Sequence, residues 1–188
     1  LDRVLVLEMV RVTEKAAIAA SRLIGRGDEK AADAAAVEAM RKAFDTLYMD
    51  GTVVIGEGER DEAPMLFIRE KVRGAQGKGP KIDIALDPLE GTTITAKAGP
   101  NGLAVLAAAE EGCLLNVPDV YMDKLAVGPG YPEGIIDLAK SPTENVKAVA
   151  AAKGVEPGDI IVCVLDRPRH SDLIAELRDL GCGVVLIG

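Results

Sequence analysis

Two carboxylates and a hydroxyl stand close together in the segment Ile82–Thr92, which reads IDIALDPLEGT. Its first part has the composition of a buried strand that delivers Asp87 at its end, and a sharp turn is expected at Pro88. Glu90 and Thr92 follow a few residues later. Carboxylate oxygens beside a hydroxyl can hold hard divalent cations and orient a water molecule. The segment therefore predicts a metal-assisted phosphate hydrolase, and a coincidental turn sequence is the alternative.

Two further acids are candidates for the same site. A helix predicted over residues 28–49 has an apolar stripe that, extended backward, includes Asp33. A carboxylate on that face is costly unless it is paired or bound to metal, and the alternative is an ordinary first-turn acid favoured by the helix dipole. Glu57 lies between two glycines just after a predicted strand, residues 52–55. Ligand groups gather at such strand ends in α/β proteins, whereas a solvated charge run is the alternative.

The remaining pattern predicts an α/β protein with two parts. A stretch rich in glycine and proline, residues 128–134, suggests one domain over residues 1–135 and the start of a second over residues 136–188. The second part has a β-α-β pattern, which implies parallel strands. The other expected elements are helices at 5–24, 65–72, 144–153 and 171–180, strands at 160–165 and 184–187, and a run at 103–109 that fits either type.

A basic loop follows the strand predicted at residues 160–165. It carries Arg167 and Arg169, and two guanidinium groups at the end of a strand can clamp a phosphate. An exposed basic turn explains the loop equally well. His170 is the only histidine, and we expect it to cap the following helix or lie at the surface.

Composition excludes several classes of partner. The net charge of −8 argues against binding to nucleic acid or to an anionic membrane surface. The 3 cysteines show no C-x-x-C spacing, which favours reduced structural thiols over zinc ligands. Hydrophobic residues make up 48% of the chain, but no apolar run is long enough for a transmembrane helix. A cytoplasmic protein is expected.

Four segments together resemble the class II fructose-1,6-bisphosphatases of bacteria. This family belongs to the lithium-sensitive, metal-dependent sugar and inositol phosphatases, whose fold is a layered αβαβα sandwich. The resemblance implies hydrolysis of the 1-phosphate of fructose 1,6-bisphosphate to fructose 6-phosphate in gluconeogenesis, with Mn²⁺ or Mg²⁺ as cofactor. The segments that carry it are GEGERDEAPM at 56–65, DIALDPLEGTT at 83–93, PDVYM at 118–122 and RPRH at 167–170.

The resemblance also implies roles for individual residues. Thr92 and Asp33 would be catalytic, with the Thr92 hydroxyl orienting the attacking water while it is hydrogen-bonded to a carboxylate such as that of Asp33. The implied metal ligands are all carboxylates: Asp33, Glu57, Asp87 and Glu90. The implied substrate-binding residues are Glu90, Gly91 and Thr92 at the scissile phosphate, and Tyr121, Arg167, Pro168 and Arg169 at the sugar and its distal phosphate.

Members of this family continue past the point where the present sequence stops. An acidic Asp-Gly-Asp loop, a glycine-rich phosphate loop and a further carboxylate ligand have no counterpart here, so a truncated C-terminal part is expected. Sedoheptulose 1,7-bisphosphate is an alternative substrate, because both sugars carry a phosphate at each end. A non-catalytic fragment that only binds metal is a further alternative. The expected partners are a small sugar bisphosphate and further copies of the chain, as a homodimer or homotetramer.

Overall fold

The computed structural model describes residues 3–57, 65–74, 78–115 and 120–187. The chain forms two compact units, Leu1–Asp119 and Val120–Gly188, and each is described by itself. The division into functional domains at residue 135 falls at a different place in the chain and stays a prediction.

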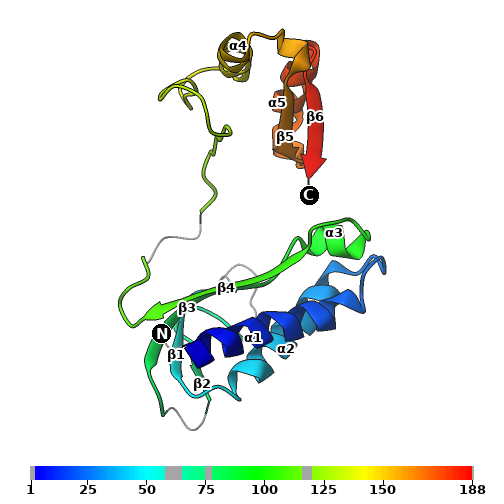
Figure 1. Cartoon of the computed structure of the whole chain (residues 1–188). Helices are drawn as coiled ribbons and strands as arrows, with labels where there is room; N and C mark the ends of the chain where they lie inside the picture. Colours follow the sequence, from blue (N-terminus) through cyan, green and yellow to red (C-terminus); the bar gives the residue numbers. More distant parts are fainter. Residues whose placement is uncertain (1–2, 58–64, 75–77, 116–119, 188) are drawn as a thin grey trace. The chain divides into compact units, whose positions relative to one another are not determined.

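The first unit begins with two helices that pack against each other (Figure 1). Helix α1 spans Arg3–Ser21 and helix α2 spans Glu29–Phe44. The Asp28 side chain caps α2 by accepting a hydrogen bond from the Ala31 amide at 2.9 Å, and aspartate is a favoured residue at this position. The prediction that α2 extends to about residue 49 is wrong. Leu47 and Met49 lie in the turn after α2, and both are buried in the core. The helix-like spacing of apolar residues therefore continues past the end of the helix.

A mixed four-stranded sheet lies beside the helical pair. Its strands are β1 (Asp50–Ile55), β2 (Lys71–Arg73), β3 (Lys81–Glu90) and β4 (Leu103–Glu110), in the order β2-β1-β3-β4. Strands β1 and β3 are parallel, while β2 and β4 run antiparallel to their neighbours. The short helix α3, Thr92–Ala96, follows β3 directly. The ambiguous run at 103–109 is therefore a strand.

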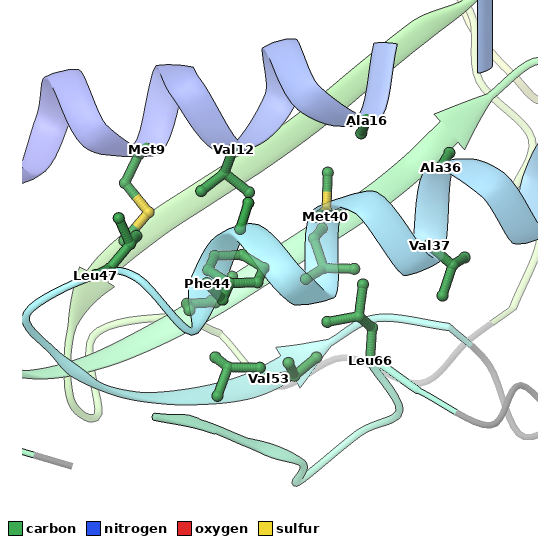
Figure 2. Packing of buried hydrophobic residues seen from close by; sticks show 14 of the residues in the cluster. Met9, Val12, Ala16, Ala36, Val37, Met40, Phe44, Leu47, Val53 and Leu66 are labelled. Atoms are coloured by element: carbon green, nitrogen blue, oxygen red, sulfur yellow. The ribbon is translucent and has the colours of Figure 1, made fainter. Parts of the chain in front are cut away.

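The core of this unit is formed by aliphatic side chains between the helices and the sheet (Figure 2). Met40 and Phe44 of α2 are fully buried and lie above Val53 of β1. Burial of each such side chain contributes about 1.5–3 kcal/mol. Asp33 lies one turn before Val37 on the same helix and is half-buried. The packing of α2 therefore brings Asp33 to the border of the core, where the sequence places it.

The second unit contains the predicted β-α-β arrangement. Strands β5 (Ile161–Leu165) and β6 (Gly183–Ile187) are parallel neighbours, joined through helix α5 (Ser171–Asp179). Helix α4 (Pro142–Lys153) precedes them, and the short 3-10 helices η3 (Pro157–Asp159) and η4 (Pro168–His170) flank β5. The apolar core of this unit is Val146, Ala150, Ile160, Val164, Ile174, Leu177 and Cys182.

The helix predicted over residues 65–72 does not form. Leu66 and Arg69 have φ angles of 61° and 75°, which are left-handed and incompatible with an α-helix. The segment instead turns and enters β2 at Lys71. Leu66 fills the core from this loop while Phe67 is exposed, so the helix-like spacing of the apolar residues misled the prediction.

The two units combine helices with mixed or parallel strands, which confirms the predicted α/β class. The αβαβα sandwich implied by the resemblance also specifies how five layers stack on one another, and this stacking stays a prediction. Within the described ranges, the structure has no helix with the length and apolar character needed to span a membrane. The cytoplasmic location stays a prediction.

Candidate functional site

The carboxyl end of β3 carries two of the predicted ligands. The strand continues through Pro88 to Glu90, so the predicted sharp turn at Pro88 is wrong. The pairing of β3 with β4 is irregular between Asp87 and Glu90. Asp87 Oδ1 accepts a hydrogen bond from the Leu89 amide at 3.0 Å, which fixes its carboxyl group across this irregularity. The bulge lets Pro88 remain in the strand, because proline needs a position without a ladder hydrogen bond.

The chain turns at Gly91, which has a φ angle of 88°. This left-handed backbone would strain any residue with a side chain, and a Cβ at Gly91 would lie 2.7 Å from Ile94 Cδ1. Thr92 is the first residue of α3 and is half-buried. The turn thus places the Thr92 hydroxyl directly after the acidic end of β3.

Two acidic groups act on the Asp87 carboxyl at this strand end. The pKa of the Asp87 carboxyl is raised to about 6, first by burial, then by a hydrogen bond to Glu90 and the negative charge of Glu90, and also by the charge of Asp33. The Leu89 amide acts in the opposite direction. The structure therefore brings Asp33, Asp87 and Glu90 together, although they come from a helix and from the end of a strand.

Glu57 occupies the equivalent end of the neighbouring strand. Strands β1 and β3 are parallel, with Ile55 opposite Ala85. Glu57 follows Ile55 by the same number of residues as Asp87 follows Ala85. Glu57 is half-buried and forms an isolated bridge with Phe67. Glu57 and Asp87 therefore lie at the carboxyl ends of two neighbouring parallel strands.

The loop between α1 and α2 holds α3 in place. The amides of Gly25 and Gly27 donate hydrogen bonds to the carbonyl oxygens of Thr95 and Ala96, each at 2.9 Å. Both glycines have left-handed backbones, with φ angles of 70° and 73°. Because the same loop leads into α2, it connects the helix that bears Thr92 with the helix that bears Asp33. The direct hydrogen bond expected between Thr92 and Asp33 stays a prediction.

Two of the substrate residues predicted in the second unit are in contact. The Arg169 guanidinium lies over the Tyr121 ring, 4.7 Å from its centroid. Arg167 is half-buried, and its Nη1 donates to the Asp166 carbonyl oxygen at 2.9 Å. His170 stands at the start of α5, where its Nδ1 lies 2.9 Å from the Leu165 carbonyl oxygen. The loop is thus arranged by local contacts, and its role in binding sugar phosphate stays a prediction.

The donor set has the chemistry that a hard divalent cation requires, because every candidate offers carboxylate oxygen. The raised pKa of Asp87 supports this fit, since clustered carboxyl groups gain from a cation that replaces a shared proton. Within the described ranges, however, no group of three or more His, Cys, Asp or Glu side chains is arranged to hold a metal ion. The gathered part of the set is therefore an acidic cluster and not a closed ligand shell.

Two acids whose roles the sequence left open can now be considered. Asp83 is buried, and its Oδ2 accepts a hydrogen bond from the Gly112 amide at 2.7 Å. Asp83 therefore fixes the turn after β4, which is a structural role. Glu59 lies outside the described residues, as do Pro118 and Asp119 of the third sequence segment.

Comparison with known proteins identifies the family of this chain. The family described as "Bacterial fructose-1,6-bisphosphatase, glpX-encoded" matches residues 3–188. The protein named "Fructose-1,6-bisphosphatase 1 class 2" from Escherichia coli (strain K12) is 51% identical over 185 residues, which cover 98% of this chain and 54% of the relative. The "D-fructose 1,6-bisphosphatase class 2/sedoheptulose 1,7-bisphosphatase" of Prochlorococcus marinus (strain NATL1A) is 49% identical over 184 residues, with the same coverage.

An α/β fold with an acidic strand end thus coincides with strong similarity to sugar bisphosphatases. The chain belongs to the family of bacterial class II fructose-1,6-bisphosphatases. It spans about half the length of the curated relatives it matches.

Sequence reasoning missed the residues that support the site. The glycines at 25 and 27 were given no role in the site, although their amides hold α3. Arg41 and Glu70 were not considered at all, although a salt bridge joins them at 2.6 Å. Their 29-residue separation hides this contact from any local pattern. The one available signal was an arginine close to the apolar stripe of α2, where an unpaired charge is costly.

Proposed function

We propose that the protein is a phosphoric monoester hydrolase that converts fructose 1,6-bisphosphate to fructose 6-phosphate with the help of divalent cations. The observation that carries this proposal is the position of Asp87 and Glu90 at the end of β3, directly before Thr92, where Asp33 of α2 also acts on Asp87. Membership of the family and the printed names of the relatives support the substrate.

Asp33, Glu57, Asp87 and Glu90 would hold the cations, Mn²⁺ or Mg²⁺. When bound, such cations neutralise charge on the phosphate and lower the pKa of a coordinated water. The chain's own contribution is to supply these carboxylates from two parallel strand ends and one helix, so that the packing of α2 on the sheet fixes their spacing.

Thr92 would orient the attacking water. Its hydroxyl can donate to a carboxylate such as that of Asp33 and accept a hydrogen bond from the water, which aims a water lone pair at phosphorus. The left-handed backbone of Gly91 leaves no side chain at this turn, so the Glu90–Thr92 backbone can approach the scissile phosphate closely.

Tyr121, Arg167, Pro168 and Arg169 would bind the sugar and its distal phosphate. The contact of Arg169 with Tyr121 supports this, because a stacked guanidinium has fewer conformations to lose when it binds an anion. A phosphate bound there would select a bisphosphate over a monophosphate.

Sedoheptulose 1,7-bisphosphate is a second candidate substrate. The name of the Prochlorococcus relative includes this activity, and that of the Escherichia coli relative does not. A homodimer or homotetramer remains our expectation for the assembly.

The test is phosphate release from each bisphosphate by the purified protein, with Mn²⁺ and with Mg²⁺. Glu57→Gln serves as the inactive control that excludes contaminating phosphatases. We expect cation-dependent release that the variant lacks. Release without added cation after chelation, or equal release by the variant, would contradict the proposed chemistry. If this chain binds Mn²⁺ and releases no phosphate, the metal-binding fragment is the correct alternative.

A further inference from the structure

A buried residue near Glu57 has an unfavourable backbone conformation. Leu66 is fully buried, and its φ angle of 61° lies in the left-handed region, which is unfavourable for a residue other than glycine. Figure 2 shows its side chain next to Met40 and Val37 of α2. Such a conformation persists only where the surroundings determine it.

Polar contacts of Glu70 determine this conformation together with the core. Glu70 Oε2 accepts a hydrogen bond from the Leu66 amide, and Glu70 Oε1 accepts one from Arg41 Nε at 2.6 Å. The Arg41 and Glu70 side chains are only 23% and 13% exposed. Burial alone would lower the pKa of Arg41, but hydrogen bonds and charges from Asp45 and Glu70 raise it. The pair is therefore tightly held. Loss of Arg41 would remove the cation that binds the Glu70 carboxylate, whereas loss of Glu70 would leave Arg41 with its salt bridge to Asp45.

Leu66 in turn holds the backbone of Glu57. The Glu57 amide donates to the Leu66 carbonyl oxygen at 3.1 Å. A Cβ atom at Gly56 would overlap this same carbonyl oxygen, so the end of β1 lies directly against Leu66. A continuous set of contacts therefore leads from Arg41 through Glu70 and Leu66 to Glu57.

We propose that Arg41 and Glu70 are positioning residues for Glu57. Arg41 lies on the same helix as Asp33, so the salt bridge ties the end of β1 to the helix that supplies another ligand. Neither residue contacts the cation; they fix where the Glu57 carboxylate can point. This inference rests on the proposed role of Glu57 as a metal ligand.

The first experiment measures the apparent Kd for Mn²⁺ from water proton relaxation in the purified protein. Arg41→Met and Glu70→Gln should each weaken Mn²⁺ binding by roughly 10- to 100-fold, as loss of groups that support a metal ligand does. Two controls separate this from general loss of stability. Lys42→Met removes an exposed salt bridge to Glu38 on the same helix, and Val12→Ala removes buried volume from the same core. Neither should change the Kd.

A double-mutant cycle shows that the effect passes through Glu57. If Arg41 acts by placing Glu57, then Arg41→Met combined with Glu57→Gln should bind Mn²⁺ no more weakly than Glu57→Gln alone. Additive losses would overturn the proposal, as would normal Mn²⁺ affinity in both Arg41→Met and Glu70→Gln. Arg41→Lys provides a milder variant if the others fold poorly, with the same expected direction.

Amide hydrogen exchange in the metal-free protein tests whether Arg41 supports the hydrogen bond between the Glu57 amide and Leu66. Exchange at the Glu57 amide should accelerate about tenfold in Arg41→Met relative to amides of β3, as loss of one hydrogen bond implies. Val12→Ala should accelerate exchange at the Glu57 amide and at the amides of β3 to the same extent. Unchanged relative exchange at Glu57 would overturn the proposal even if Mn²⁺ binds. Absence of Mn²⁺ binding by the unmodified protein would instead refute the proposed metal site.

Discussion

Replacement of Asp87 by asparagine should stabilise the metal-free protein at neutral pH. The amide side chain would keep the size of the original and the oxygen that accepts from the Leu89 amide, while it removes a charge from the acidic cluster. The pKa of Asp87 is about 6 in place of the ordinary 3.8 because burial, Glu90 and Asp33 all disfavour its ionised form. The charge on Asp87 therefore opposes folding at pH 7.

The sign of the pH dependence follows from this direction. Since the pKa is raised in the folded state, the folded protein binds more protons than the unfolded chain between about pH 4 and pH 6. The contribution of Asp87 to stability thus improves as the pH falls through 6 and is complete below 3.8. The full shift of the Asp87 pKa corresponds to about 3 kcal/mol of folding free energy, at 1.36 kcal/mol per pKa unit. Asp87 is only partly buried, so solvent screening reduces this to about 1–2 kcal/mol.

The difference in the free energy of unfolding between Asp87→Asn and the unmodified protein can be measured by urea unfolding. Circular dichroism would follow unfolding in chelator-treated samples at pH 7.5 and pH 5. The Asp87→Asn protein should be the more stable at pH 7.5 by about 1–2 kcal/mol, and the gap should narrow at pH 5. Asp123→Asn, an exposed change in the second unit, is the control and should show no gap. An Asp87→Asn protein that is less stable than the unmodified one at pH 7.5 would refute the reasoning.

Three further predictions concern activity. Asp33→Asn should abolish cation-dependent phosphate release without lowering the stability of the metal-free fold; near-normal turnover would make Asp33 an ordinary first-turn acid. Thr92→Ala should lower kcat by about 10²-fold or more with little change in KM, and an effect confined to KM would reassign Thr92 to substrate binding. Arg169→Ala should reduce kcat/KM for a bisphosphate about tenfold or more while hydrolysis of a small aryl phosphate changes little. Equal losses on both substrates would remove Arg169 from the specificity role.

Much of the fold was predictable because it depends on local periodicity. The α1 stripe, the Asp28 cap and the β5-α5-β6 unit each leave a pattern within a short window of sequence. Asp33 was also predictable, since a charge on the apolar line of a helix conflicts with burial unless something compensates it. The negative charge of Asp33 raises the pKa of Asp87, so Asp33 lies near the end of β3, and this like charge adds to the cost of burying both carboxyl groups.

The remaining features depend on contacts between distant segments. Residues 65–70 have helix-like spacing, but Glu70 is bound by Arg41 of another element and holds Leu66 in a left-handed conformation. Pro88 stays in β3 because the pairing with β4 is irregular there, and the proline alone does not distinguish such a bulge from a turn. Local propensity cannot anticipate either outcome, because tertiary partners decide both.

Mn²⁺ titration followed by paramagnetic broadening of NMR signals tests the central claim most directly, namely that the acidic end of β3 binds a hard divalent cation. We predict that the NMR signals of Asp33, Asp87, Glu90 and Thr92 broaden first and that the broadening saturates as Mn²⁺ is added. The broadening should be reversed by chelator and should be lost in Asp87→Asn. Broadening that is not saturable in the millimolar range, or that persists unchanged in Asp87→Asn, would contradict the account.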